Sequence, residues 1–339
     1  MLGNRDSQFA SWWDLRDDQM SAYRNIEPKL RAFSCKRGKW LPVGSFWGVV
    51  NYGATPESGL MTLLVGVPKP HHRLRALIVT LSMRSVIPIH VVIDQMTTVM
   101  TVPDPTPLLP TQALSQPPLE MGSAIHNRAT GTMSFALNEG NRWFGVSCGH
   151  VLNNIGGPVY RPPLQLTTQP IGVSKSVEVF ASQGNIRWLV DVGLFEITDP
   201  TTAQGYQGVR RILTGVIPFT INESMGPFEG VHKPLGFTSD RVGVAGHDRG
   251  EHLKIMRVDF HWRYETFTAS VLVGQGLTVS YGDSGAPVFD WLNGDVIGII
   301  QGGTTDGTGL VAIIPIDQVC ASVRRQVNAI LQAPVQAAP

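Results

Sequence analysis

A proline-rich stretch at residues 102–120 constrains this chain more than any other feature of its sequence. The stretch reads VPDPTPLLPTQALSQPPLE and contains six prolines. Proline fixes φ and lacks an amide hydrogen, so this density opposes a helix or a central strand and favours an extended linker. The chain has 339 residues, more than one domain of roughly 100–200 residues needs. We therefore expect an N-terminal segment at 1–102, a linker at 103–118 and a larger domain at 119–335.

The N-terminal segment predicts a small β-α-β unit. Residues 1–58 hold four tryptophans without a regular period, which indicates an irregular segment with one helix at 6–23. The apolar run at 60–67 predicts a strand, residues 71–84 have leucine and isoleucine at helical spacing, and residues 88–102 predict strand again. No group of chemically active side chains occurs there. We expect a packing appendage, with a regulatory partner as the open alternative.

Beyond the linker the sequence is typical of an all-β protein. Short runs rich in Val, Ile, Thr and Phe alternate with clusters of Gly, Pro and Asn. This pattern favours a barrel or a sandwich of antiparallel strands. A closing apolar stretch at residues 316–331 has helical spacing.

Charge and cysteine content argue against several classes of protein. The net charge is +1 without a block of like charges, so no nucleic-acid or membrane partner is expected. The N-terminus lacks the apolar region of a signal peptide, and no apolar run approaches the ~20 residues that span a bilayer. Three widely spaced cysteines predict neither a disulfide framework nor a zinc site. A reducing, cytoplasmic setting is expected.

A serine motif is the strongest local signal of chemistry. Residues 282–289 read GDSGAPVF. A serine hydroxyl becomes a useful nucleophile when a base removes its proton and nearby N–H groups stabilise the resulting oxyanion. The glycine two positions before Ser284 lets the N–H groups of Gly282 and Ser284 point at one spot. By itself, the motif is equally compatible with a polar turn between strands.

Two residues upstream strengthen the assignment of Ser284 as a nucleophile. His150 ends the apolar run FGVSCGH, and Asp191 lies within WLVDVGLF. Alone, such a histidine is more often structural, and such an aspartate is more often a cap. Together, the order His150, Asp191, Ser284 is the order of base, orienting carboxylate and nucleophile in the chymotrypsin triad.

These motifs resemble those of a known family. Residues 118–335 are similar to the trypsin-like serine proteases of the chymotrypsin fold, particularly the disulfide-free bacterial-type branch, in Gly149-His150-Val151, in Asp191 to Leu194 and in the GDSGAPV run. The resemblance implies a mainly β fold of two antiparallel β-barrels, with the triad in the cleft between them. It implies no organic cofactor and no metal. The small α/β unit would precede the barrels as an appendage.

The resemblance also indicates a substrate pocket. It places Thr278, six residues before the nucleophile, at the base of the pocket, with Gly303 and Gly309 near its walls. A neutral threonine cannot compensate the positive charge of a bound Lys or Arg side chain. Burial of such a charge without a partner costs on the order of 3–5 kcal/mol. Cleavage after apolar or neutral residues is therefore expected, unless Asp306 folds its carboxylate into the pocket. A further resemblance, to a hairpin of the second barrel, covers residues 232–246.

The expected function is that of a serine endopeptidase, acting on a peptide or protein substrate as an intracellular processing or regulatory enzyme. The alternative is a binding or scaffold protein that keeps the fold without activity, since fold alone does not establish function. Cys148, two residues before His150, could indicate redox chemistry or a metal. Free cysteine is among the most buried residue types, so a core position is the preferred interpretation.

Overall fold

The fold is mainly β, as the sequence predicts. A computed structural model describes residues 17–35, 41–52, 60–83, 85–98, 119, 122–161, 169–183, 186–199, 231–233, 248–250, 254–256, 260–264, 267–275, 279, 281–290, 296–305 and 308–333. Twenty strands and three helices form in this described part. Two large, mostly antiparallel sheets carry the fold, in agreement with the expected double-barrel architecture. No helix in the described part is long and apolar enough to cross a bilayer.

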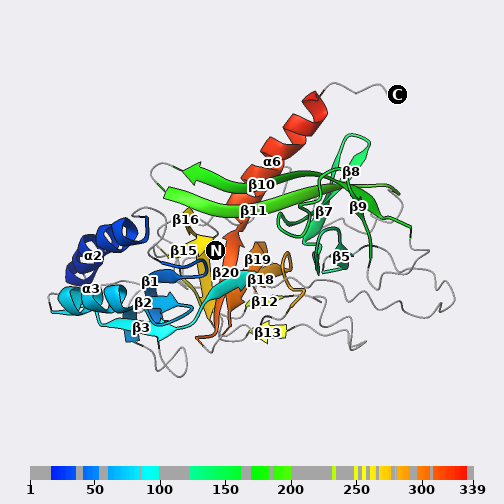
Figure 1. Ribbon diagram of the computed structural model, residues 1–339. Helices are drawn as coiled ribbons and strands as arrows, with labels where there is room; N and C mark the ends of the chain where they lie inside the picture. Colours follow the sequence, from blue (N-terminus) through cyan, green and yellow to red (C-terminus); the bar gives the residue numbers. More distant parts are fainter. Residues whose placement is uncertain are drawn as a thin grey trace, which may run out of the picture.

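The first sheet has ten strands and joins the N-terminal unit to the region beyond the linker. Its order is β3-β2-β1-β15-β16-β11-β10-β9, and β8 pairs with both β11 and β7. The long hairpin of β10 and β11 spans the molecule between the end with α2 and α3 and the end with β7 to β9 (Figure 1). The strands are β1 Phe46–Tyr52, β2 Leu60–Val67, β3 Ile89–Ile93, β7 Phe135–Glu139, β8 Arg142–Cys148, β9 Pro158–Val159, β10 Gly172–Gln183, β11 Ile186–Ile197, β15 His261–Tyr264 and β16 Phe267–Ser270.

The second sheet has eight strands. Its order is β13-β12-β18-β19-β20-β17-β14. Strand β4 pairs with β19 on the side opposite β20, beyond the residues that pair with β18. The strands are β4 Met96–Thr98, β12 Val231–Lys233, β13 Asp248–Gly250, β14 Lys254–Met256, β17 Leu272–Gln275, β18 Pro287–Asp290, β19 Val296–Thr304 and β20 Leu310–Pro315. A separate pair is formed by β5 Ala124–His126 and β6 Thr130–Thr132.

The predicted β-α-β unit forms. Strand β2 pairs in parallel with β3, and α3 His72–Ser82 connects them. Two details of the sequence interpretation were wrong. The N-terminal helix α2 is Asp17–Cys35 and continues well beyond the expected end at residue 23. Residues 1–58 are also not irregular throughout, because β1 lies within them and pairs along its whole length with β2. A polar helix and an aromatic strand without strict alternation give weak periodic signals, which explains both errors.

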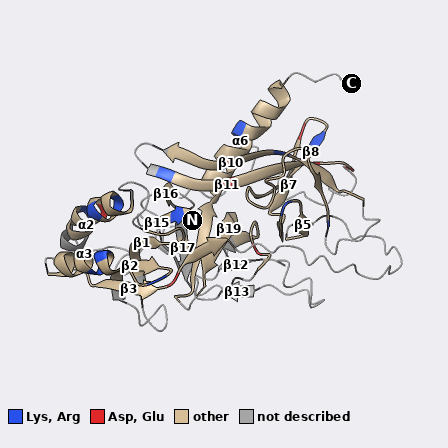
Figure 2. Ribbon diagram, viewed as in Figure 1, with Lys and Arg blue, Asp and Glu red and all other residues tan. Residues whose placement is uncertain are grey.

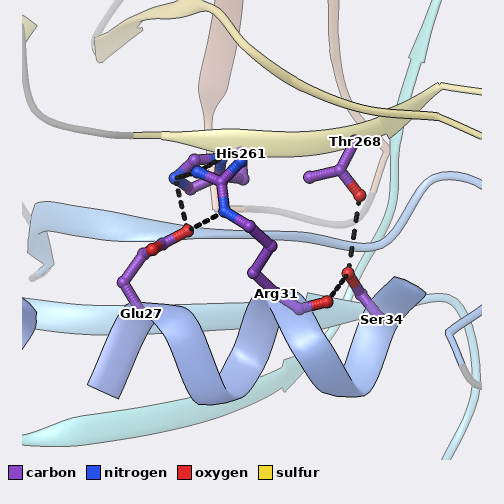
Figure 3. A network of polar contacts seen from close by, with 5 residues as sticks. All are labelled: Glu27, Arg31, Ser34, His261 and Thr268. Atoms are coloured by element: carbon purple, nitrogen blue, oxygen red, sulfur yellow. Dashed lines mark hydrogen bonds and ion pairs between the residues drawn. The ribbon is translucent and has the colours of Figure 1, made fainter. Parts of the chain in front are cut away.

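Helix α2 carries charges of both signs (Figure 2). Two of its charged residues contact β15, and an uncharged serine contacts β16 (Figure 3). Arg31 Nε donates to Glu27 Oε1 at 2.8 Å, and the same carboxylate oxygen lies 3.1 Å from His261 Nε2. One turn further along the helix, the Ser34 hydroxyl donates to the Arg31 carbonyl at 2.9 Å and contacts the Thr268 hydroxyl. The helix is therefore docked by partly buried polar contacts as well as by its apolar face.

The N-terminal unit pairs with the rest of the chain at two places. Strand β1 pairs with β15, Phe46 opposite Trp262. Strand β4 pairs with β19, Thr98 opposite Gly302. The expected linker at 103–118 lies outside the described residues, so the division of the chain into domains stays a prediction. The two pairings show that contacts across this division hold the parts together.

The main core lies between the two sheets and is closed by the C-terminal helix. Helix α6, Ile316–Gln332, coincides with the apolar stretch expected to be helical. It places Gln326 against β11, where its amide donates to the Val192 carbonyl at 3.1 Å. The core includes Phe135, Phe144, Val192 and Leu194 from the first sheet, Val288, Ile299 and Ile313 from the second, and Val319 and Val323 from α6.

Candidate active site

A β-bulge turns Asp191 into the molecule. Strand β11 has one extra residue relative to β10 at this point, because Val192 pairs with Glu178 while Leu189 pairs with Phe180. Asp191 has φ 44°, a left-handed conformation that aspartate tolerates better than most residues. Bulges of this kind redirect a side chain and are frequent beside active sites. The Asp191 carboxylate is consequently buried between the two sheets.

The Asp191 carboxylate holds His150. One oxygen accepts the His150 backbone N–H at 2.9 Å, and the other lies 2.5 Å from His150 Nδ1. A carboxylate accepts hydrogen bonds, so this contact assigns the donating proton to Nδ1, and in the neutral imidazole Nε2 is then the acceptor. His150 Nε2 is buried and has no hydrogen-bond partner within the described part of the chain. The imidazole is thus oriented with its basic nitrogen available.

Gln301 of β19 links this pair to Ser284. Its side-chain amide donates to Asp191 Oδ2 at 2.9 Å, while its backbone carbonyl accepts the Ser284 hydroxyl at 3.2 Å. All four residues are buried. His150, in the turn after β8, is therefore in direct contact with Asp191 of β11. Ser284, in the turn before β18, is linked to Asp191 through Gln301. Gln301 was missed, because a glutamine at the end of an apolar run gives no local signal of such a role.

The turn that carries Ser284 is clamped by the segment around β6 and β7. Thr132 donates twice, from its N–H to the Ser284 carbonyl and from its hydroxyl to the Gly282 carbonyl, each at 2.7 Å. Gly282 and Gly285 have φ 100° and 91°, which favours glycine. A Cβ at Gly285 would lie 2.1 Å from the Thr132 carbonyl oxygen. The glycines on both sides of Ser284 are therefore required by backbone geometry.

A metal site formed by Cys148, His150 and Asp191 is the competing interpretation, since their ligand atoms lie within 4.8 Å of one another. Binding of a metal requires the thiolate. Burial, reinforced by the Asp191 charge, raises the pKa of Cys148 well above its usual value. The thiol instead donates to the Ile300 carbonyl at 3.2 Å, and His150 Nδ1 is already engaged by Asp191. These contacts favour a core role for Cys148.

The residues expected to form the substrate pocket are only partly described. Gly303 lies in β19 and pairs with Val311 of β20, and a Cβ there would lie 2.6 Å from the Val279 side chain. Gly309 is exposed and has open space around its Cβ position. Thr278, Asp306 and most of residues 232–246 lie outside the described residues. The pocket and the preference for a neutral residue therefore stay predictions.

No protein-family model matches the sequence, and a comparison with curated proteins gives no match. Several solved structures are similar in fold. Alpha-lytic protease homolog N4 is 14% identical, with a TM-score of 0.40 over 61% of this chain and 97% of that one. Thermobifida fusca protease A is 16% identical, with a TM-score of 0.38 over 61% and 96%. Cellulomonas bogoriensis chymotrypsin is 15% identical, with a TM-score of 0.36 over 61% and 96%. The roles of individual residues rest on the geometry of the site.

Proposed function

We propose that the chain is a serine endopeptidase in which Ser284 is the nucleophile, His150 the general base and Asp191 its orienting carboxylate. The observation that carries this proposal is the buried contact of Asp191 with His150, together with the bridge from Asp191 through Gln301 to Ser284. No ordinary structural role requires a buried carboxylate, a buried imidazole with an unpartnered nitrogen and a serine between two turn glycines in one place.

The mechanism follows from the proton positions. Because Nδ1 donates to Asp191, His150 Nε2 is the base that accepts the Ser284 proton as Oγ attacks a peptide carbonyl carbon. Ser284 must first turn its hydroxyl from the Gln301 carbonyl toward Nε2. The N–H groups of Gly282 and Ser284 stabilise the oxyanion. His150 then returns the proton to the leaving amine, and water hydrolyses the acyl-enzyme. Asp191 stabilises the imidazolium at each stage.

An intracellular, processing or regulatory role forms part of the proposal. It is supported by Cys148 and Cys320, which are buried and not joined in a disulfide, because secreted proteins of this size more often use disulfides. The alternative, an idle protease fold used for binding, would not need His150 Nε2 to remain a free acceptor.

Labelling with a fluorophosphonate tests the proposal without a known substrate, because the probe reacts only with an activated serine. The wild-type protein should be labelled, and Ser284→Ala and His150→Ala should not. Hydrolysis of a sensitive peptide by Ser284→Ala should fall to the residual level that binding and oxyanion stabilisation provide, roughly 10³ to 10⁴ over water.

Ser182→Ala serves as the matched control, since Ser182 is exposed on β10 and should leave labelling unchanged. Equal labelling of Ser284→Ala and wild type would refute the assignment of the nucleophile. Folded wild-type protein without any labelling would support the idle alternative.

A further inference from the structure

The edge of β19 beside Ser284 is suited to bind an extended peptide. The Gln301 carbonyl accepts the Ser284 hydroxyl, so the next residues of β19 lie immediately beside the proposed nucleophile. On one side, Gly302 and Gly303 pair with Ala312 and Val311 of β20. The other side offers backbone N–H and C=O groups to an added strand, a common mode of peptide recognition.

Strand β4 of the same chain occupies that side. It runs antiparallel to β19, with Thr98 opposite Gly302, Thr97 opposite Gly303 and Met96 opposite Thr304. The chain direction therefore brings β4 toward Gln301 and Ser284 as it approaches its last described residue. No other strand in the described part pairs with this side of β19 over Gly302 to Thr304.

Glycine at position 302 permits the contact. A Cβ on Gly302 would lie 2.0 Å from the Thr97 carbonyl oxygen and 2.9 Å from its carbon. These are backbone atoms, which cannot move aside as the end of a flexible side chain can. The backbone of a neighbouring strand can therefore approach β19 closely at position 302 because residue 302 has no side chain.

The residues before β4 fix it in this place. Asp94 is almost fully buried, and its carboxylate accepts the N–H groups of Thr305 and Thr308 at 3.2 and 3.3 Å and the Thr308 hydroxyl at 2.6 Å. The Met96 N–H donates to the Gly44 carbonyl at 2.9 Å. Strand β4 is thus tied both to the loop after β19 and to the segment before β1.

On the basis of the proposed function, we propose that β4 is an internal competitor of the peptide substrate. It occupies the backbone-binding edge of the active site as an extended strand. A substrate must displace β4 to pair with β19, so the enzyme is held in a restrained state by residues 96–98.

Two prolines in β4 should release the edge. Thr97→Pro combined with Thr98→Pro removes the amide hydrogens that a strand needs for pairing. If β4 occupies the edge nine tenths of the time, apparent affinity for a peptide is lowered about tenfold. The double variant should therefore show kcat/KM about tenfold higher on a peptide with a neutral residue before the cut. Thr111→Pro, within the proline-rich stretch, should leave kcat/KM unchanged.

An added peptide supplies the reverse test. The acetylated and amidated peptide DQMTT, residues 94–98, should inhibit the double variant competitively, and a scrambled peptide should not. A folded double variant with unchanged kcat/KM, or one that the DQMTT peptide fails to inhibit, would overturn the inference.

A third measurement uses wild-type protein and does not depend on folding of the variant. Covalent reaction with a peptidyl phosphonate several residues long should accelerate amide hydrogen exchange at residues 96–98, and a small fluorophosphonate should not. Unchanged exchange with both reagents would overturn the inference while leaving Ser284 labelled. Absence of Ser284-dependent labelling would instead refute the proposed function itself.

Discussion

At the scale of single residues, Gln301 is the residue on which the geometry of the site depends most. Its amide holds one oxygen of Asp191, and the same oxygen contacts His150. Its carbonyl holds the Ser284 hydroxyl. Gln301 therefore acts as a positioning residue, which orients the carboxylate and through it the imidazole, without taking part in proton transfer.

Removal of the Gln301 amide should slow the chemical step. A hydrogen bond to a charged group contributes about 1.5–3 kcal/mol, which corresponds to roughly 10- to 100-fold in rate. Gln301→Leu should therefore lower kcat on a peptide substrate by about that factor with little change in KM. Steady-state kinetics would check this prediction.

Gln318→Leu is the matched control, since Gln318 is a buried glutamine of α6 that should not affect kcat. A rise in KM at constant kcat would show that Gln301 acts on substrate binding rather than on orientation of Asp191.

At the scale of elements, the docking of α2 depends on a buried neutral histidine. His261 stacks on Trp47 at 5.2 Å between ring centroids, and its Nε2 faces Glu27. Burial, together with the positive charge of Arg31, lowers the pKa of His261 to about 3. In the tautomer with its proton on Nε2, the neutral imidazole donates to Glu27, and this contact needs no charge on the ring.

The lowered pKa of His261 predicts loss of stability in acid. Between about pH 3 and pH 6.5 the folded state binds fewer protons than the unfolded state. The free energy of unfolding therefore decreases as pH falls through this window, and the stabilising contribution of neutral His261 is fully present above it. Each unit of pKa shift corresponds to about 1.4 kcal/mol. The free energy of unfolding would therefore fall by roughly 5 kcal/mol at about pH 3. Urea denaturation at pH 7.5, 6.0 and 4.5 would measure the part of this loss that occurs above pH 4.5, roughly 3 kcal/mol.

His261→Phe should flatten that pH dependence, because phenylalanine keeps the aromatic contact with Trp47 and does not titrate. His72→Phe, at an exposed position of α3, should keep the wild-type slope. Parallel slopes for wild type and His261→Phe would show that other groups cause the acid sensitivity.

At the scale of the whole molecule, the parts before and after the proline-rich stretch share one apolar cluster. Phe46, Leu64 and Met96 from the N-terminal side pack with Trp262 and Leu310 from the other side. Pairing of β1 with β15 and of β4 with β19 adds backbone hydrogen bonds across the same boundary.

Cleavage within residues 102–120 should therefore leave the two fragments associated. Exposed proline-rich segments make few contacts and are preferred sites of limited proteolysis. The nicked protein should elute as one species in size-exclusion chromatography at neutral pH, and denaturing electrophoresis should separate it into two fragments. First cuts inside residues 122–199, or fragments that separate under native conditions, would contradict this prediction.

Local patterns in the sequence were enough to predict much of this protein. Strand β2 follows from a continuous apolar run, which is typical of a strand buried on both faces. Helix α6 follows from helical spacing, because a buried stripe must repeat at the period of the helix. The motifs singled out His150 and Asp191, which are in direct contact, and Ser284, which Gln301 links to Asp191. The catalytic roles of these three residues stay predictions. The weakly periodic α2 and β1 were the elements that this reasoning misplaced or missed.

Only the tertiary structure decided how distant segments meet. The bulge that turns Asp191 inward, the two contacts of Gln301 and the placement of β4 on β19 each depend on pairing between residues far apart in the chain. The sequence of a strand does not indicate which other strand it pairs with, since a strand edge can accept many sequences through its backbone alone. The sequence by itself therefore determined most of the elements and the candidate chemistry, and long-range strand pairing determined that β4 of the same chain pairs with β19 beside the proposed nucleophile.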